Sequence, residues 1–145
     1  GKVKEKWTYK NGKINGQYLS FHENGQLHMR GSKDENNKWE DGLVEQYHGN
    51  GALLVKGIIK DSNWADGTYL SYFDDGSLWV EETYKNGVLQ GPSVKYFRNG
   101  RIAAEVTWVN GELDGEATTY FPFGEVWRRE LYSQGELIHS QYVGE

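Results

Sequence analysis

The residues of this chain that could do chemistry are four histidines and three pairs of adjacent acidic residues. The histidines are His22, His28, His48 and His139. His22 and His48 hold the same place in two neighbouring copies of a repeat, so their rings could stack and bind a metal ion, although zinc sites in proteins normally use three or four ligands. Later copies hold an aromatic ring at this place, namely Phe73, Phe97 and Phe121. We therefore interpret the place as a slot for a ring and expect no metal ion and no cofactor.

The acidic pairs are Asp34-Glu35, Asp74-Asp75 and Glu81-Glu82. Adjacent residues on a β-strand point to opposite faces, so the two carboxylates of a pair cannot act together in acid-base catalysis. The chain has no cysteine, and it lacks the nucleophile elbow, the phosphate-binding loop and the dinucleotide fingerprint. These observations predict that the protein is not an enzyme.

The elements that would position any functional residue follow from an internal repeat. Its anchors are five glycines spaced 24 to 26 residues apart, Gly16, Gly42, Gly67, Gly91 and Gly115. Four of them follow Asn or Asp, which is the strongest short signal for a hairpin turn. A second glycine comes nine residues after each anchor, at Gly25, Gly51, Gly76, Gly100 and Gly124. Each repeat therefore predicts a pair of turns.

Apolar residues also keep their places between these turns. Phe or Tyr stands five residues after every anchor, and Leu, Ile or Val stands eleven residues after it, as in Tyr72 and Leu78. The segments between turns are about seven residues long, which suits strands and is too short for stable helices. The predicted fold is all-β: tandem antiparallel β-hairpin repeats forming an elongated, twisted single sheet, with residues 1–145 as one domain.

The repeat resembles the MORN repeat, in particular the bacterial variant found in YwqK-type antitoxin proteins. The residues that carry the resemblance are Asp66-Gly67, Tyr72, Asp75-Gly76, Leu78, Tyr84 and Asn86-Gly87, and in the next copy Gly91, Tyr96, Asn99-Gly100, Ile102, Trp108 and Asn110-Gly111. The resemblance covers nearly the whole chain. It implies a row of consecutive hairpins and a role as an immunity protein or antitoxin that neutralises a toxin, while other MORN-type proteins are scaffolds.

A partner-binding face is predicted from the residues at even positions after each anchor. This set mixes aromatic and charged residues, as protein interfaces do, and includes Tyr18, Tyr69, Phe73, Trp79, Phe97, Phe121 and Trp127 among Arg30, Lys56, Glu81, Glu105 and Arg129. Trp39 and Trp64, in the two atypical turns, are candidate anchors as well. Alternatively, the even face encloses its own groove and the two tryptophans cap the sheet edge. The odd positions are assigned to packing.

Composition and charge narrow the class of partner. With a net charge of −5 the chain is poorly suited to neutralising nucleic-acid phosphates or anionic lipids, and no apolar run is long enough to span a bilayer. We expect a protein partner, a basic toxin domain above all, with self-association through exposed edge strands as the alternative. The expected location is the bacterial cytoplasm. The periplasm and the cell surface stay open because the sequence begins with Gly rather than Met.

Overall fold

The computed structural model describes residues 4–144, which divide into two compact units. The first unit comprises Gly1–Ala65 with Asp74–Gly76, and the second comprises Asp66–Phe73 with Ser77–Glu145. Throughout the described residues the only regular elements are strands, and every strand pairing is antiparallel. The predicted fold class of antiparallel hairpin repeats is confirmed.

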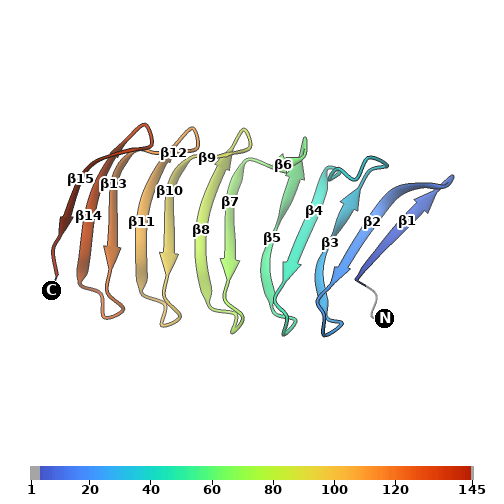
Figure 1. Ribbon diagram of the computed structural model, residues 1–145, viewed down its shortest axis with the longest axis horizontal. Helices are drawn as coiled ribbons and strands as arrows, with labels where there is room; N and C mark the ends of the chain where they lie inside the picture. Colours follow the sequence, from blue (N-terminus) through green and yellow to red (C-terminus); the bar gives the residue numbers. More distant parts are fainter. Residues whose placement is uncertain (1–3, 145) are drawn as a thin grey trace. The chain divides into compact units, whose positions relative to one another are not determined.

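The first unit holds an open sheet with the strand order β1-β2-β3-β4-β5, to which the short β6 adds beside β5 (Figure 1). Its strands are β1 (Glu5–Lys10), β2 (Lys13–Phe21), β3 (Leu27–Lys33), β4 (Gly42–Tyr47), β5 (Leu53–Lys60) and β6 (Asn63–Trp64). Each strand pairs with its neighbour in the sequence, as hairpin repeats require.

The second unit repeats this pattern in the order β7-β8-β10-β11-β13-β14-β15, with β9 beside β8 and β12 beside β11. Its strands are β7 (Gly67–Tyr72), β8 (Leu78–Lys85), β9 (Val88–Leu89), β10 (Gly91–Tyr96), β11 (Ile102–Val109), β12 (Glu112–Leu113), β13 (Gly115–Tyr120), β14 (Val126–Ser133) and β15 (Glu136–Tyr142). No helix long and apolar enough to cross a membrane occurs in residues 4–144.

The Asn-Gly turns have the backbone that tight hairpins need. At Asn86 and Gly87 both φ angles are positive, 52° and 78°, which matches the two central residues of a type I′ turn. Asp61 and Ser62 adopt the same conformation without a glycine, with φ of 50° and 63°. The looser turn predicted between Asp61 and Asp66 therefore begins with a strained version of the same tight turn.

Side chains in the turns also connect one hairpin to the next. Asp66 Oδ1 accepts a hydrogen bond of 2.8 Å from the backbone N–H of Asn86, twenty residues later. The same bond, with the same spacing, joins Asp41 to Asp61, Gln90 to Asn110 and Asp114 to Gln134. Before four of the five anchor glycines, the side chain of the preceding residue thus stabilises the following turn.

A β-bulge interrupts every long hairpin at one place. In the β7–β8 hairpin Ser71 pairs with Val80 and Tyr72 pairs with Leu78, so Trp79 is the extra residue. Equivalent register shifts occur in the corresponding hairpins of the other four repeats, after Ser20, Gln46, Lys95 and Thr119. An extra residue reverses the alternation of faces. Residues at odd positions after the bulge therefore lie on the same face as residues at even positions before the bulge.

We call the face that carries the residue two places after each anchor glycine face A, and the opposite face of the same unit face B. The buried apolar residues all lie on face A; they are Tyr18, Val44 and Ile59 in the first unit and Val80 and Ala117 in the second. The prediction that even positions form one face and odd positions the packing face is therefore wrong, because the bulge exchanges the two sets along each hairpin.

Candidate partner-binding surfaces

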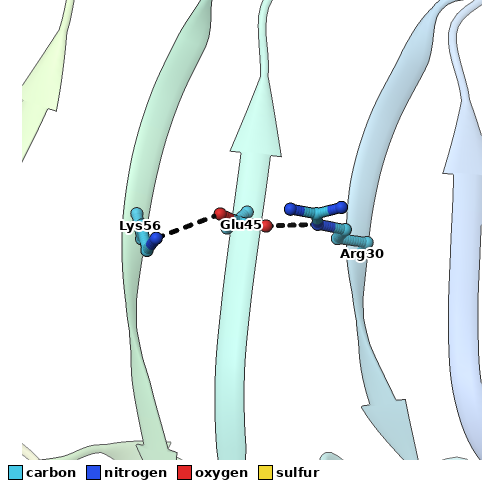
Figure 2. A network of polar contacts seen from close by, with 3 residues as sticks. All are labelled: Arg30, Glu45 and Lys56. Atoms are coloured by element: carbon cyan, nitrogen blue, oxygen red, sulfur yellow. Dashed lines mark hydrogen bonds and ion pairs between the residues drawn. The ribbon is translucent and has the colours of Figure 1, made fainter.

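The charged residues of the predicted interface lie on face B. In the first unit Glu45 lies between Arg30 on β3 and Lys56 on β5, and its carboxylate pairs with both (Figure 2). The Glu45 side chain is only 6% exposed, whereas those of Arg30 and Lys56 are 49% and 55% exposed. The hydrogen bond from Arg30 holds the pKa of Glu45 below its usual range, so the carboxylate stays ionised despite its burial.

In the second unit face B carries Glu81 and Glu105. The two glutamates flank Val94, which pairs with both across the sheet. The Tyr120 hydroxyl donates a 2.6 Å hydrogen bond to Glu105 Oε2, and this bond, together with burial, raises the pKa of Tyr120. Glu105 is therefore held in place by the neighbouring hairpin, and its position is defined before any partner binds.

Four aromatic residues of the predicted interface lie on face A instead, namely Tyr18, Trp39, Trp64 and Tyr69. Tyr18, on face A of the first unit, is 7% exposed, and its ring packs against Trp7 at 4.6 Å and Trp39 at 5.6 Å between centroids. The Lys33 ammonium lies 4.2 Å from the Tyr18 ring and 4.6 Å from the Trp39 ring. Trp39 also covers Gly31, where a Cβ atom would lie 2.7 Å from the indole. These contacts place Tyr18 and Trp39 in the packing of the unit.

Trp64 and Tyr69 also lie on face A of their respective units. Trp64 pairs with Ile59 across the β5–β6 hairpin and is half-buried. The Tyr69 ring packs edge-on against Tyr84 with 5.7 Å between centroids. Burial raises the pKa of Tyr84, and the nearby Glu82 carboxylate, which accepts its hydroxyl hydrogen bond, adds to the effect. The predicted mixture of aromatic and charged residues on a single face is therefore wrong for Tyr18 and Tyr69, because the strands place them on the face opposite the charged residues.

Aromatic pairs form at the ends of the hairpins in the second unit. Phe73 contacts the bulged Trp79 with 5.7 Å between ring centroids, and the Arg98 guanidinium lies 4.6 Å from the Phe73 ring. Phe121 and Trp127, which hold the same repeat places, lie 6.3 Å apart. Trp79 and Trp127 are 39% and 37% exposed, so both rings offer surface to a partner.

The last of these pairs is part of a larger exposed group. Phe123 stacks on Phe121 at 5.1 Å with nearly parallel rings, and Tyr142 lies 5.7 Å from Trp127. Phe123 and Tyr142 are 60% and 63% exposed. We call Phe121, Phe123, Trp127 and Tyr142 the aromatic cluster. Phe123 and Tyr142 were not predicted as site residues, although Phe123 replaces the Asn or Asp that precedes the second glycine in every other repeat.

His22, which holds the repeat place shared with His48, contacts a histidine of its own hairpin. His22 lies against His28, 4.6 Å between ring centroids, and its Nε2 lies 2.8 Å from the Tyr47 carbonyl oxygen. Burial, followed by the charge of His22, lowers the pKa of His28. Among residues 4–144, no three side chains of the His, Cys, Asp and Glu types come together as a metal site would require.

Comparison with known proteins gives one family match. Three segments of the chain, residues 14–32, 65–86 and 113–134, match the MORN repeat variant. The latter two segments span the β7–β8 and β13–β14 hairpins, and the first runs through most of β2 and β3. No curated protein matches the chain significantly. The MORN-repeat part of the resemblance is therefore supported, and repeats of this kind suggest a repeat-based binding module.

Proposed function

We propose that this chain is a non-catalytic protein-binding module that binds a cognate bacterial toxin in the cytoplasm and neutralises it. The observation that carries the proposal is the aromatic cluster, in which Phe123 and Tyr142 are more than half exposed and Trp127 is over one third exposed. Exposed aromatic residues that touch one another are typical anchors of protein interfaces, where Trp, Tyr and Arg contribute most of the binding energy. Arg128 lies 5.2 Å from the Trp127 ring and supplies a cation beside the cluster.

The geometry also supports binding without rearrangement. Trp127 and Tyr142 lie on neighbouring strands of one sheet, since Arg128, next to Trp127, pairs directly with Tyr142, and Phe121 and Phe123 lie in the turn that joins β13 to β14. A surface held by a hydrogen-bonded ladder loses little conformational entropy when a partner binds, which favours affinity. Toxin neutralisation needs only such a surface, placed over the toxin's own active site.

Growth rescue tests the proposal directly. The protein encoded beside this chain is co-expressed with it in bacteria, and the native chain is expected to restore growth. Trp127→Ala and Tyr142→Ala should weaken rescue and binding at least tenfold, as interface anchors do. Tyr9→Ala is the matched control, because Tyr9 is 62% exposed and lies in the first unit. Continued killing with the native chain, or equal rescue by all three variants, would contradict the proposal.

The net charge of −5 predicts how salt affects binding. An acidic protein attracts a basic toxin over distances of about one Debye length, so the association rate should fall as ionic strength rises. Stopped-flow measurements between about 10 and 300 mM salt check this. An association rate that does not change with salt would rule out a basic partner. The role of the aromatic cluster would then be tested by Trp127→Ala and Tyr142→Ala alone.

Self-association is the second candidate function, and β15 favours it. All seven residues of β15 are exposed, and among the described strands it pairs with β14 only. Leu137 and Ile138 are 52% and 58% exposed on this strand, and an exposed apolar edge can add a strand from a second copy. Light scattering at high concentration should then show a dimer that Ile138→Lys dissociates. A monomer at every concentration would exclude this function.

A further inference from the structure

Face A of the second unit contains a pocket that no function described so far uses. Its volume is about 180 Å³, and it opens on the face that carries the buried residues of the unit. The lining comes from β8, β10, β11 and β12 and consists of Glu82, Ser93, Lys95, Ala104, Val106, Trp108 and Leu113. Cross-strand pairing brings these side chains to one face, since Ser93 pairs with Val106, Lys95 with Ala104 and Trp108 with Leu113.

Two small residues in the fourth repeat create the hollow. The place two residues after the anchor holds Tyr18, Val44 or Tyr69 in the first three repeats, and the fourth has Ser93. The place thirteen residues after the anchor holds Met29, Val55 or Val80, and the fourth repeat has Ala104. Ser93 pairs with Val106 and Ala104 pairs with Lys95, so the two small side chains are diagonal neighbours on β10 and β11. The first three repeats have larger side chains at both places, and the fifth has Ala117 and Arg128.

Two polar atoms of the pocket have no hydrogen-bond partner among the described residues. They are the hydroxyl oxygen of Ser93, a residue that is 5% exposed, and the indole Nε1 of Trp108. Buried polar groups are nearly always paired, and an indole N–H can only donate. Its missing partner must therefore be an acceptor. A carboxylate lines the same pocket, that of Glu82, which accepts the hydroxyl hydrogen bond of Tyr84 and has further acceptor capacity.

We propose that this pocket receives one apolar residue of a partner polypeptide. The side chain of that residue packs against Ala104, Val106 and Leu113. Its backbone carbonyl accepts from Trp108 and Ser93, and its backbone N–H donates to Glu82. This inference rests on the proposed protein-binding function and adds the chemistry that the partner must present.

Size and charge support this occupant over other ligands. Sites for drug-sized molecules measure about 300 to 1,000 Å³, so a pocket of about 180 Å³ suits a single side chain. A free carboxylate ligand would face the like charge of Glu82, whereas a peptide group is neutral and offers both the acceptor and the donor that the pocket lacks. Lys95 is exposed and lines the same pocket, so the pocket carries one charge of each sign.

The test uses N-acetyl-leucine N-methylamide as the probe, titrated into the full chain and followed by NMR. The native chain should show a saturable shift of the Trp108 indole signal, with a dissociation constant on the order of 1 mM for so small a ligand. Ala104→Leu fills the pocket and should abolish the shift. Trp108→Phe keeps an aromatic ring, although a smaller one, and removes the donor. Binding to this variant, followed at the Val106 amide, should be about tenfold weaker. Trp7→Phe, which changes a tryptophan of the first unit outside the pocket, should bind as the native chain does.

Three results would overturn the inference. They are an equal shift with N-methylacetamide, which has no side chain; unchanged binding in a folded Ala104→Leu variant; and free leucine binding better than the capped residue. Should Ala104→Leu fail to fold, as judged by circular dichroism, the Trp108→Phe comparison still decides. The outcome is separate from growth rescue: a chain that binds the probe but rescues no cells keeps the pocket and refutes neutralisation.

Discussion

Replacing Glu45 by Gln probes the best-buried ion pair of the first unit. The substitution keeps the shape of the side chain and removes its charge between Arg30 and Lys56 (Figure 2). A hydrogen bond to a charged group contributes about 1.5 to 3 kcal/mol. The partners of Glu45 are half-exposed, which screens the interaction, and Gln can still accept a hydrogen bond. We therefore expect the free energy of unfolding to fall by about 1 kcal/mol.

The stability lost in Glu45→Gln should depend on pH in a defined direction. Because Arg30 lowers the pKa of Glu45 in the folded state, the folded carboxyl binds its proton less readily than the unfolded one. The stabilisation is then fully present above the unfolded pKa of about 4.3 and disappears as the pH falls through the lower, folded value. The native chain and Glu45→Gln should differ most near pH 7, and the difference should shrink as the pH falls below about 4.3.

Urea unfolding, followed by circular dichroism and tryptophan fluorescence at a series of pH values, measures this difference. Two probes are needed because the chain has two compact units, and coincident curves are required before a single free energy is assigned. Glu116→Gln is the matched control, since Glu116 is exposed on face B of β13. A Glu45→Gln loss within about 0.5 kcal/mol of the control, or one that does not shrink as the pH falls below about 4, would refute the reasoning.

Three further substitutions test the connections between hairpins. Asn99→Ala removes both the bond from its side-chain amide to the Pro122 carbonyl and the acceptor for its own turn, so thermal unfolding should show a loss of stability of about 1 kcal/mol. Asn99→Asp keeps the acceptor for the turn, so it should lose only the part of the stability that is due to the Pro122 bond. Asp114→Ala should speed hydrogen exchange at the Gln134 amide about tenfold, with unchanged exchange contradicting the bond. Gly31→Ala should destabilise the chain by about 1 to 3 kcal/mol and shift tryptophan fluorescence, because the new Cβ meets an indole at 2.7 Å; a neutral result would mean that the indole moves freely.

Much of the fold follows from the sequence because its determinants are local. Asn86-Gly87 predicts a tight turn from two adjacent residues, and the structure has positive φ at both. The constant places of Tyr72 and Leu78 correctly indicate residues of one hairpin, and the two are direct cross-strand partners. Turn conformation and hairpin pairing depend on residues within one repeat, so their spacing is sufficient to predict them.

The faces and the sites depended on the tertiary structure. The bulge at Trp79 changes the register by one residue. Simple alternation of faces along the sequence does not reveal a bulge, so it assigned Tyr69 and Glu81 to the same face. The aromatic cluster and the pocket each combine residues from several strands, so neither has a contiguous signal. Neither Ser93 nor Ala104 is unusual by itself, and the two line one hollow only because the β10–β11 pairing brings them to the same face as diagonal neighbours. Local residue types therefore determined the hairpins, whereas packing between hairpins decided which side chains are buried, which are exposed and where a partner can bind.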